Sequence, residues 1–259
     1  MVPTKTRTQR TLYTYTHTYS PYILIFDMPV FLAEHPVLKA KLTVLRKKST
    51  DAKVFRDVLR EITFYLGYEA TRDIETREVK IDTPVSSNAT GHKLKTRVSL
   101  IPVLRSGLGM VEPMTQLLPY AQVFHLGLYR HKHSLVPVLY YERFPRECAA
   151  DISIILEPMI ATAKTLTATI DIVKRKYGCK KIKVISVVAS SSGLKELERA
   201  HPDVDIHCCT VDDELNEDGF VTPGLGDIGD RQFRTNVGKA TWDDEEDMAS
   251  PSNKKQRTS

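Results

Sequence analysis

The sequence predicts an α/β fold with a mostly parallel central sheet flanked by helices, a small flap or hood and an N-terminal helical segment. Short apolar runs rich in β-branched residues recur in the second half of the chain, and helical patterns lie between several of them. These runs are apolar along their length, as strands buried on both faces are. Such an alternation of β and α elements builds a parallel sheet covered by helices on both sides.

Composition limits the classes of protein to which the chain can belong. Its 259 residues, 41% of them hydrophobic, are enough to bury a sizeable core. No stretch approaches the roughly 20 apolar residues of a membrane span, which excludes an integral membrane protein. Four cysteines without a CxxC pair argue against a disulfide scaffold and a structural zinc site, so we expect a reducing, cytoplasmic setting. A net charge of +5 favours a polyanionic ligand without demanding nucleic acid.

The two ends differ in composition from the middle. Residues 1–22 are rich in Thr and Tyr, and no acidic residue precedes Asp27, so we expect a disordered leader. A transit peptide has a similar bias, which leaves organellar targeting as an alternative. Residues 237–259 form a charged tail, expected to be disordered, whose basic cluster weakly resembles a nuclear-import signal. The folded domain is therefore predicted over residues 23–236.

The first half of this domain is predicted to hold two helices and a hairpin. Apolar residues at helical spacing cover residues 36–46 and 50–67, and Thr50 or Asp51 can cap the second helix. The polar segment 73–95 contains two short alternating runs, which indicate a hairpin or flap.

The second half is predicted to hold the sheet. The expected strands cover residues 98–103, 122–128, 151–156, 181–189 and 204–211, and the expected helices cover residues 108–118, 165–177 and 194–200. Gly178 ends the second of these helices, and Ser192 can cap the third. Because ligands of such folds bind beyond the carboxyl ends of the strands, function is expected in the turns that follow them.

The first two of these turns are basic. Arg105 stands beside Gly107 and Gly109, so backbone N–H groups and a guanidinium can together cradle an anion; an ordinary β–α turn is the alternative. The next turn, residues 129–133, contains Arg130 and is either a second anion contact or a solvated run of charges.

The third turn, residues 157–165, leads directly into a helix, whose N-terminus favours phosphate. Glu157 at the strand tip can accept hydrogen bonds from sugar hydroxyls, although a plain capping turn with Thr165 as N-cap explains the same residues. The fourth segment, residues 219–230, has four glycines and one proline and is either a loop that binds a flat ligand or a surface loop. The acidic run 212–214 is interpreted as a solvated turn rather than a metal site.

Together these turns resemble the uracil phosphoribosyltransferase family over roughly residues 35–235. The resemblance is carried by Tyr68-Glu69-Ala70-Thr71, Pro102-Val103-Leu104-Arg105-Ser106-Gly107-Leu108-Gly109-Met110, Tyr129-Arg130, residues 157–165 and Pro223-Gly224-Leu225-Gly226-Asp227-Ile228-Gly229-Asp230. It implies the conversion of uracil and 5-phosphoribosyl 1-diphosphate (PRPP) to UMP and diphosphate with Mg²⁺, a step of pyrimidine salvage. It also implies a homodimer or tetramer, GTP as a possible activator, and neither membrane nor nucleic acid as a partner.

The resemblance assigns roles residue by residue. Arg105 and Asp227 are implied to be catalytic. The implied PRPP-binding residues are Arg105, Arg130, Glu157, Pro158, Met159, Ile160, Ala161, Thr162, Ala163, Lys164, Thr165 and Asp227. The implied uracil-binding residues are Val221, Gly226, Asp227 and Ile228. No protein ligands for a metal are expected, because Mg²⁺ can be held mainly through PRPP.

The PRPP loop departs from the family pattern Asp-Pro-Met-Leu-Ala-Thr-Gly-Gly. Glu157 replaces the aspartate, and Ala163 and Lys164 replace the two glycines. If either glycine position has a positive φ, another residue there costs of order 1 kcal/mol or more. A catalytically weakened or inactive paralogue that binds uracil or UMP and regulates a partner is therefore an alternative to the enzyme. An RNA-binding regulator on the same fold is a third, although no interleaved aromatic and basic platform is visible.

Overall fold

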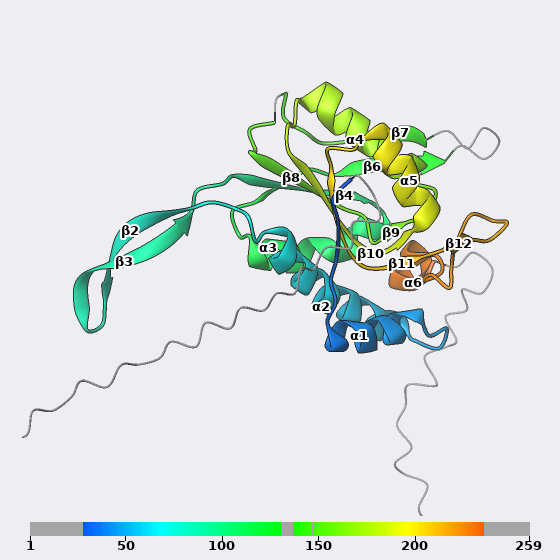
Figure 1. Cartoon of the computed structure of the whole chain (residues 1–259), viewed down its shortest axis with the longest axis horizontal. Coiled ribbons are helices and arrows are strands. Elements are labelled where there is room, and N and C mark those ends of the chain that lie inside the picture. The colour runs from blue at the N-terminus through cyan, green and yellow to red at the C-terminus, as the bar shows by residue number, and fades with distance from the viewer. Residues whose placement is uncertain (1–27, 131–136, 147, 236–259) are drawn as a thin grey trace, which may run out of the picture.

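The computed structural model describes residues 28–130, 137–146 and 148–235 (Figure 1). The expected leader 1–22 and tail 237–259 lie outside these residues, as do positions 131–133 of the basic turn. In the described part of the chain, no helix is both long and apolar enough to cross a membrane.

A nine-stranded sheet forms the centre of the fold, in the order β1-β11-β10-β8-β4-β6-β7, with β5 paired to β4 and β9 to β10. All of its pairs are parallel except β6 with β7. Its strands are β1 (Val30–Leu32), β4 (Val98–Leu104), β5 (Gln122–Val123), β6 (Leu126–Arg130), β7 (Pro137–Glu142), β8 (Ile152–Leu156), β9 (Met159–Ile160), β10 (Ile182–Ser190) and β11 (Asp205–Asp212). All nine residues of β10 are buried, as a central strand with helices on both faces requires. The prediction of a mostly parallel α/β sheet is confirmed.

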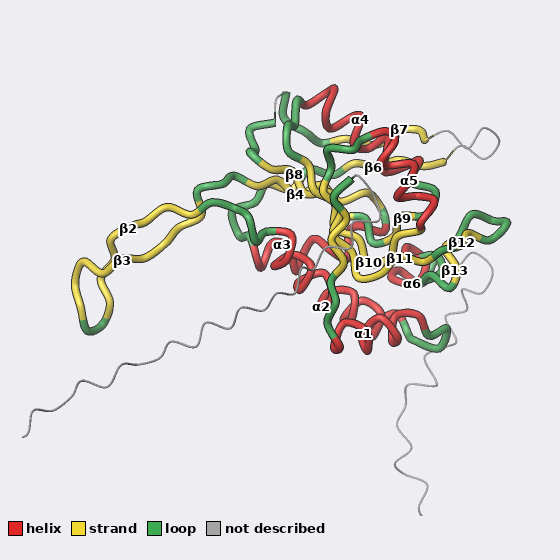
Figure 2. Tube along the Cα trace, in the orientation of Figure 1, coloured by secondary structure: helices red, strands yellow, loops and turns green. Residues whose placement is uncertain are grey.

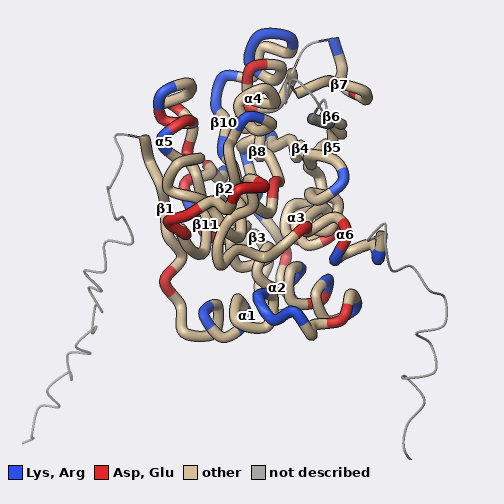
Figure 3. The backbone as a smooth tube through the Cα atoms, turned by 90° about the vertical axis from the view of Figure 1, so that its right-hand side faces the viewer, with Lys and Arg blue, Asp and Glu red and all other residues tan. Residues whose placement is uncertain are grey.

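Two helical layers cover the sheet (Figures 1 and 2). On one face, α4 (Lys164–Tyr177) and α5 (Ser191–Ala200) contribute Leu166, Ile170 and Leu194 to one core cluster. The second cluster is filled by α1 (Pro36–Arg46), α2 (Ala52–Ala70), α3 (Val111–Leu117), the 3₁₀ turn η1 (Ser106–Met110) and α6 (Ile228–Phe233). Basic and acidic residues are interspersed along the helices (Figure 3).

Most predicted elements are present, with local differences at their ends. Asp51 caps α2, its side chain accepting from the Val54 N–H at 2.9 Å, and Gly178 ends α4 with φ +68°. The prediction that Ser192 caps α5 was wrong: Ser190 is the cap, because the helix follows β10 without a loop. The alternative of a capping turn with Thr165 as N-cap is also wrong, because Ala163 occupies the N-cap position of α4. The expected strand 122–128 is interrupted and forms β5 and β6.

The predicted hairpin consists of β2 (Thr76–Thr83) and β3 (Ser86–Leu94) and projects from the body of the fold (Figures 1 and 2). Its strands pair antiparallel, and most of their residues are exposed. A second small sheet pairs β12 (Glu214–Leu215) with β13 (Val221–Thr222) next to the glycine-rich loop.

Candidate active site

Three segments meet beyond the carboxyl ends of the parallel strands: the turn after β4, the turn after β8 and the loop before α6. They line two adjoining pockets of about 220 and 190 Å³. Ser106, Glu157 and Met159 line both pockets and so mark where the two adjoin. The larger pocket adds Arg105, Phe220, Asp227, Ile228 and Gly229, and the smaller extends over the turn that begins α4.

The turn after β4 presents Arg105 to the larger pocket. Its guanidinium is half-exposed and bridges to the first turn of α6 and to the segment after this helix, donating to Asp230 Oδ1 at 3.1 Å and to Thr235 Oγ1 at 2.7 Å. The Leu104–Arg105 peptide bond is cis. A cation is thus fixed at the pocket while keeping part of its surface accessible, which suits it to a ligand's anionic group.

Close backbone packing joins this turn to β8. A Cβ on Gly107 would stand 2.3 Å from the Leu156 carbonyl oxygen, so only glycine fits there. The Ser106 hydroxyl donates to Glu157 Oε1 at 2.9 Å, and Gln232 Nε2 donates to the Ser106 carbonyl at 2.8 Å. The carboxylate of Glu157 is therefore positioned by the neighbouring turn.

The predicted PRPP loop, residues 157–165, which we call the phosphate loop, is held by β10. The Pro158 carbonyl accepts from the N–H groups of Val187 at 2.9 Å and Val188 at 3.2 Å, and the Ala161 carbonyl accepts from Ser190 Oγ at 2.6 Å. Helix α4 then starts without a side-chain cap. The first N–H groups of a helix have no partner within it and carry its positive dipole end, so this turn can bind an anion.

Ala163 occupies the left-handed region, with φ +58° and ψ −6°, and is buried. A non-glycine residue there costs about 1–2 kcal/mol. Lys164, by contrast, is the first helical residue and is exposed. Of the two positions where the family has glycine, strain therefore falls on Ala163 only. Nearby, the buried Thr162 Oγ1 has no hydrogen-bond partner among the described residues.

The loop of residues 219–230, called the base loop after its predicted role, is anchored by an ion pair between the partly buried Arg46 and the buried Asp212. Arg46 donates to both carboxylate oxygens of Asp212, at 2.8 and 2.7 Å, and to the Gly224 carbonyl at 3.0 Å. Asp212 also accepts from the Gly224 N–H at 3.0 Å. The interpretation of residues 212–214 as a solvated turn was wrong for Asp212, because this carboxylate is buried and organises the loop.

Asp227 and Ile228, two of the predicted uracil-binding residues, line the larger pocket. Asp227 caps α6, accepting from the Asp230 N–H at 2.8 Å, and remains exposed. Val221 is buried beneath the loop and Gly226 is exposed at φ +71°; neither is among the lining residues of the two pockets. Any contribution of Val221 and Gly226 to uracil binding would come from the backbone conformation that they give the loop.

Among the predicted PRPP residues, Arg105, Glu157, Met159, Ile160, Ala161, Ala163, Thr165 and Asp227 line one or both pockets. Pro158, Thr162 and Lys164 belong to the same loop without lining them. Arg130 ends β6, which runs parallel to β4, so its backbone reaches the same edge of the sheet. Phe220 and Asp230 lie in the predicted loop 219–230 but were not predicted as site residues. Arg46 lies far from every predicted turn, and no sequence motif around it indicates a role.

Comparisons with known proteins agree with this arrangement. The profile of the family described as uracil phosphoribosyltransferase matches residues 32–235. A uracil phosphoribosyltransferase of Ureaplasma urealyticum is 47% identical over 204 residues, covering 79% of this chain and 98% of that protein. One from Roseiflexus castenholzii is 44% identical over 206 residues, covering 80% and 98%. The solved structure of the AQ2163 protein from Aquifex aeolicus superposes with a TM-score of 0.75 at 34% identity, covering 80% of this chain and 99% of that one. This chain belongs to the uracil phosphoribosyltransferase family.

Proposed function

We propose that the chain is a uracil phosphoribosyltransferase that converts uracil and PRPP to UMP and diphosphate. One observation carries the proposal: the turn before α4 and the loop before α6 line adjoining pockets that share Ser106, Glu157 and Met159. A phosphorylated sugar bound in one pocket and a flat base bound in the other would meet beside these shared residues.

The PRPP side of the site uses the phosphate loop and two arginines. The uncapped N-terminus of α4, with the hydroxyls of Thr162 and Thr165 nearby, is proposed to bind the 5′-phosphate. Glu157, oriented by Ser106, is proposed to accept hydrogen bonds from the ribose hydroxyls. Arg105 and Arg130 are proposed to neutralise the diphosphate.

The uracil side uses the base loop. Asp227 and Ile228 stand at the start of α6 in the larger pocket, and backbone N–H and C=O groups of this loop are proposed to pair with the edge of the pyrimidine. The Arg46–Asp212 pair holds the backbone of Gly224 and so limits the movement of the loop. Rigid donors and acceptors favour selection of one base by its edge.

The reaction needs positioning and charge stabilisation more than a protein nucleophile. Diphosphate leaves the ribose through a transition state with cationic character on the sugar, so fixing both reactants and neutralising the leaving group lowers the barrier. Mg²⁺ bound to the diphosphate oxygens would supply further neutralisation. Glu157 and Asp227 are the carboxylates that line the larger pocket, and one or two carboxylates together with substrate phosphates are the usual ligands of Mg²⁺, so these two side chains would hold a cation brought in by PRPP.

UMP formation from uracil, PRPP and Mg²⁺ by the full chain tests the proposal, with and without GTP. Turnover that Arg105→Ala abolishes supports the enzyme, and a change of rate with GTP would support its role as an activator. UMP binding without turnover under all of these conditions would instead support the inactive regulatory paralogue, for which the strained Ala163 is the motivating observation.

We also propose that the chain assembles as a homodimer or a larger assembly through the β2–β3 hairpin. An isolated two-stranded hairpin is at best marginally stable in water. Here it exposes Ile81, Val85 and Leu94, and Tyr120 is almost fully exposed beside the pocket at its base. Sedimentation of the full chain should give a dimer or tetramer, and replacing residues 79–91 by a short glycine-serine turn should shift it toward the monomer. A monomeric wild-type chain would refute this arrangement.

A further inference from the structure

A pocket of about 240 Å³ lies at the opposite edge of the sheet, where β10 and β11 begin and α2 ends. Phe31, Leu66, Lys183, Asp205 and His207 are among its lining residues. His207 precedes Asp212, the anchor of the base loop, by five residues in the same strand. This separation corresponds to about 17 Å along β11, so the pocket is distinct from the candidate active site.

Strand register places the polar lining on one face. Lys183 pairs with Asp205 across β10 and β11, and Phe31 pairs with His207 across β1 and β11. Because side chains alternate along a strand, Asp205 and His207 project from the same face, toward α2. The rings of Phe31 and His207 stack with centroids 4.4 Å apart and planes within 6°.

His207 is buried without hydrogen bonds. Its side chain is about 95% buried, and neither ring nitrogen has a hydrogen-bond partner among the described residues. Burial, with Lys183 close by, lowers the pKa of His207 to about 3, so the imidazole is neutral near pH 7 and offers one donor and one acceptor. Buried polar groups are nearly always paired, so this one is an exception that a ligand would explain.

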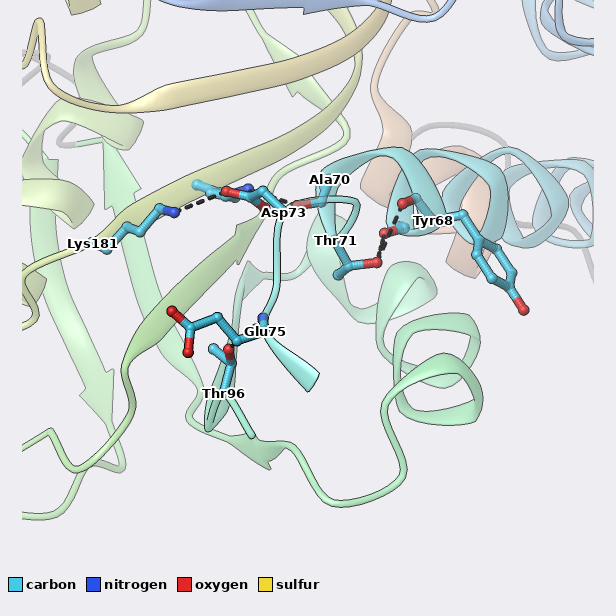
Figure 4. Close-up of polar contacts among 9 residues, drawn as sticks. Tyr68, Ala70, Thr71, Asp73, Glu75, Thr96 and Lys181 are labelled. Atoms are coloured by element: carbon cyan, nitrogen blue, oxygen red, sulfur yellow. Dashed lines mark hydrogen bonds and ion pairs between the residues drawn. The ribbon is translucent and has the colours of Figure 1, made fainter. Parts of the chain in front are cut away.

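The cations of the pocket, in contrast, are already paired. The buried Lys183 ammonium donates to the Ala70 carbonyl at the end of α2 at 2.8 Å and pairs with Asp73. Asp73 also pairs with Lys181 at 2.8 Å, and Figure 4 shows these two side chains facing each other while Tyr68 points away. Arg72 pairs with Glu69. The structure therefore leaves no free cationic pair for a phosphate.

Asp205 adds an acceptor. Burial raises the pKa of its carboxyl, and it makes no hydrogen bond or ion pair with another described residue. The lining holds two cations, Arg72 and Lys183, and three carboxylates, Glu69, Asp73 and Asp205, and the ion pair of Asp73 with Lys181 balances the remaining negative charge. A balanced lining with one unpaired carboxyl favours an uncharged ligand that donates hydrogen bonds.

We propose that this pocket binds a small uncharged heterocycle with an amino group beside a ring nitrogen, the chemistry of an amino-bearing nucleobase or its nucleoside. The amine would donate to Asp205, and the ring nitrogen would pair with His207. The apolar side chains of Leu32, Ala33 and Leu66 would contact the faces of the ring. The volume is below the roughly 300–1,000 Å³ of typical ligand pockets, so a nucleobase or a nucleoside suits it better than a dinucleotide.

Titration calorimetry of the full chain with adenine, cytosine, adenosine and cytidine, each with and without UMP, tests this site. At least one probe should bind, and UMP should leave its affinity unchanged. His207→Phe, which keeps the stacked ring and removes both nitrogens, and Asp205→Asn should each weaken binding about tenfold or more. His201→Phe, at another buried histidine, should leave the affinity unchanged. This test needs no turnover, so its outcome is independent of the catalytic proposal.

Several results would overturn the site: no probe binding up to about 5 mM, equal affinity in His207→Phe, or full competition by UMP.

A second experiment tests whether His207 is neutral in the folded chain. His207 binds a proton near pH 6.5 in the unfolded chain but only near pH 3 in the folded chain. Its contribution to the free energy of unfolding is therefore fully present above about pH 6.5 and is lost progressively as the pH falls below that value. The melting temperature of the wild type should therefore fall faster than that of His207→Phe between about pH 7 and about pH 5. If the melting temperatures of the two proteins fall equally with pH, His207 is not a buried neutral imidazole and the proposed site is overturned.

Discussion

The two loops of the active site reach irregular conformations in different ways. The base loop has glycine at each of its left-handed positions, Gly219, Gly224 and Gly226. The phosphate loop has Ala163 at its left-handed position and no glycine between Glu157 and Thr165. The glycines of the base loop favour its conformation, whereas Ala163 disfavours the conformation of the phosphate loop.

Different contacts therefore stabilise the conformations of the two loops. The phosphate loop is fixed by β10, whose N–H groups and Ser190 hydroxyl bind the carbonyls of Pro158 and Ala161. These contacts do not depend on the residue at 163, so replacing a glycine there costs strain without reshaping the loop. The base loop turns so tightly at Gly224 that its own backbone leaves no room for a side chain.

Gly224→Ala should have the largest effect, a loss of about 3 kcal/mol or more in the free energy of unfolding. A Cβ at this position would stand 2.0 Å from the Val221 carbonyl, in addition to the cost of φ +52°. Urea denaturation measures the loss. Gly219→Ala is the matched control, because its φ is also positive but its nearest contact would be 3.9 Å, and it should cost only about 1 kcal/mol. Equal losses would show that steric closure at Gly224 is not what shapes the loop.

Asp227→Asn should reduce kcat/KM for UMP formation about 100-fold or more, because it removes a negative charge from the larger pocket. Stability should change by less than about 0.5 kcal/mol, since asparagine caps a helix as well as aspartate does. Steady-state kinetics and thermal unfolding separate the two effects. Asp218→Asn, on an exposed residue just before the base loop, should keep full activity. Parental activity in the Asp227 variant would remove the catalytic role proposed for this residue.

Ala163→Gly should have the smallest effect and the opposite sign, a gain of about 1 kcal/mol in stability from relief of the left-handed strain. Ala168→Gly, within helix α4, should lose about 1 kcal/mol and serves as its control. Chemical denaturation of the two variants beside the parent measures both. A loss of stability in Ala163→Gly would mean that the left-handed conformation at this position is not strained.

Local sequence signals predicted the elements that have regular periodicity. Helix α1 matches its expected bounds, and β4, β8, β10 and β11 lie within a residue or so of the expected strands. The short elements β1, β7 and α6 were not predicted. The six residues of α6 lie in a segment whose glycines and proline suggest only loop, so the Asp227 cap was not recognised as the start of a helix.

The candidate site shows the same division. Motifs predicted the pocket-lining residues of the turns, because each turn is contiguous in the sequence. The Arg46–Asp212 pair that holds the base loop joins residues 166 positions apart. Only the folded topology brings them together, so no local pattern distinguishes Asp212 from a solvated acidic turn. The family pattern has glycine at positions 163 and 164, which suggests a left-handed φ at either one, and only the structure shows that Ala163 has it.

We expect β10 to keep the phosphate loop in a working conformation despite Ala163. The most direct measurement is the KM for PRPP and the kcat of the parent chain and of Ala163→Gly, at saturating uracil and Mg²⁺. We expect the parent to form UMP and the two KM values to agree within about threefold. An inactive parent whose activity is restored by Ala163→Gly, or a KM that falls about tenfold or more in the variant, would contradict the claim.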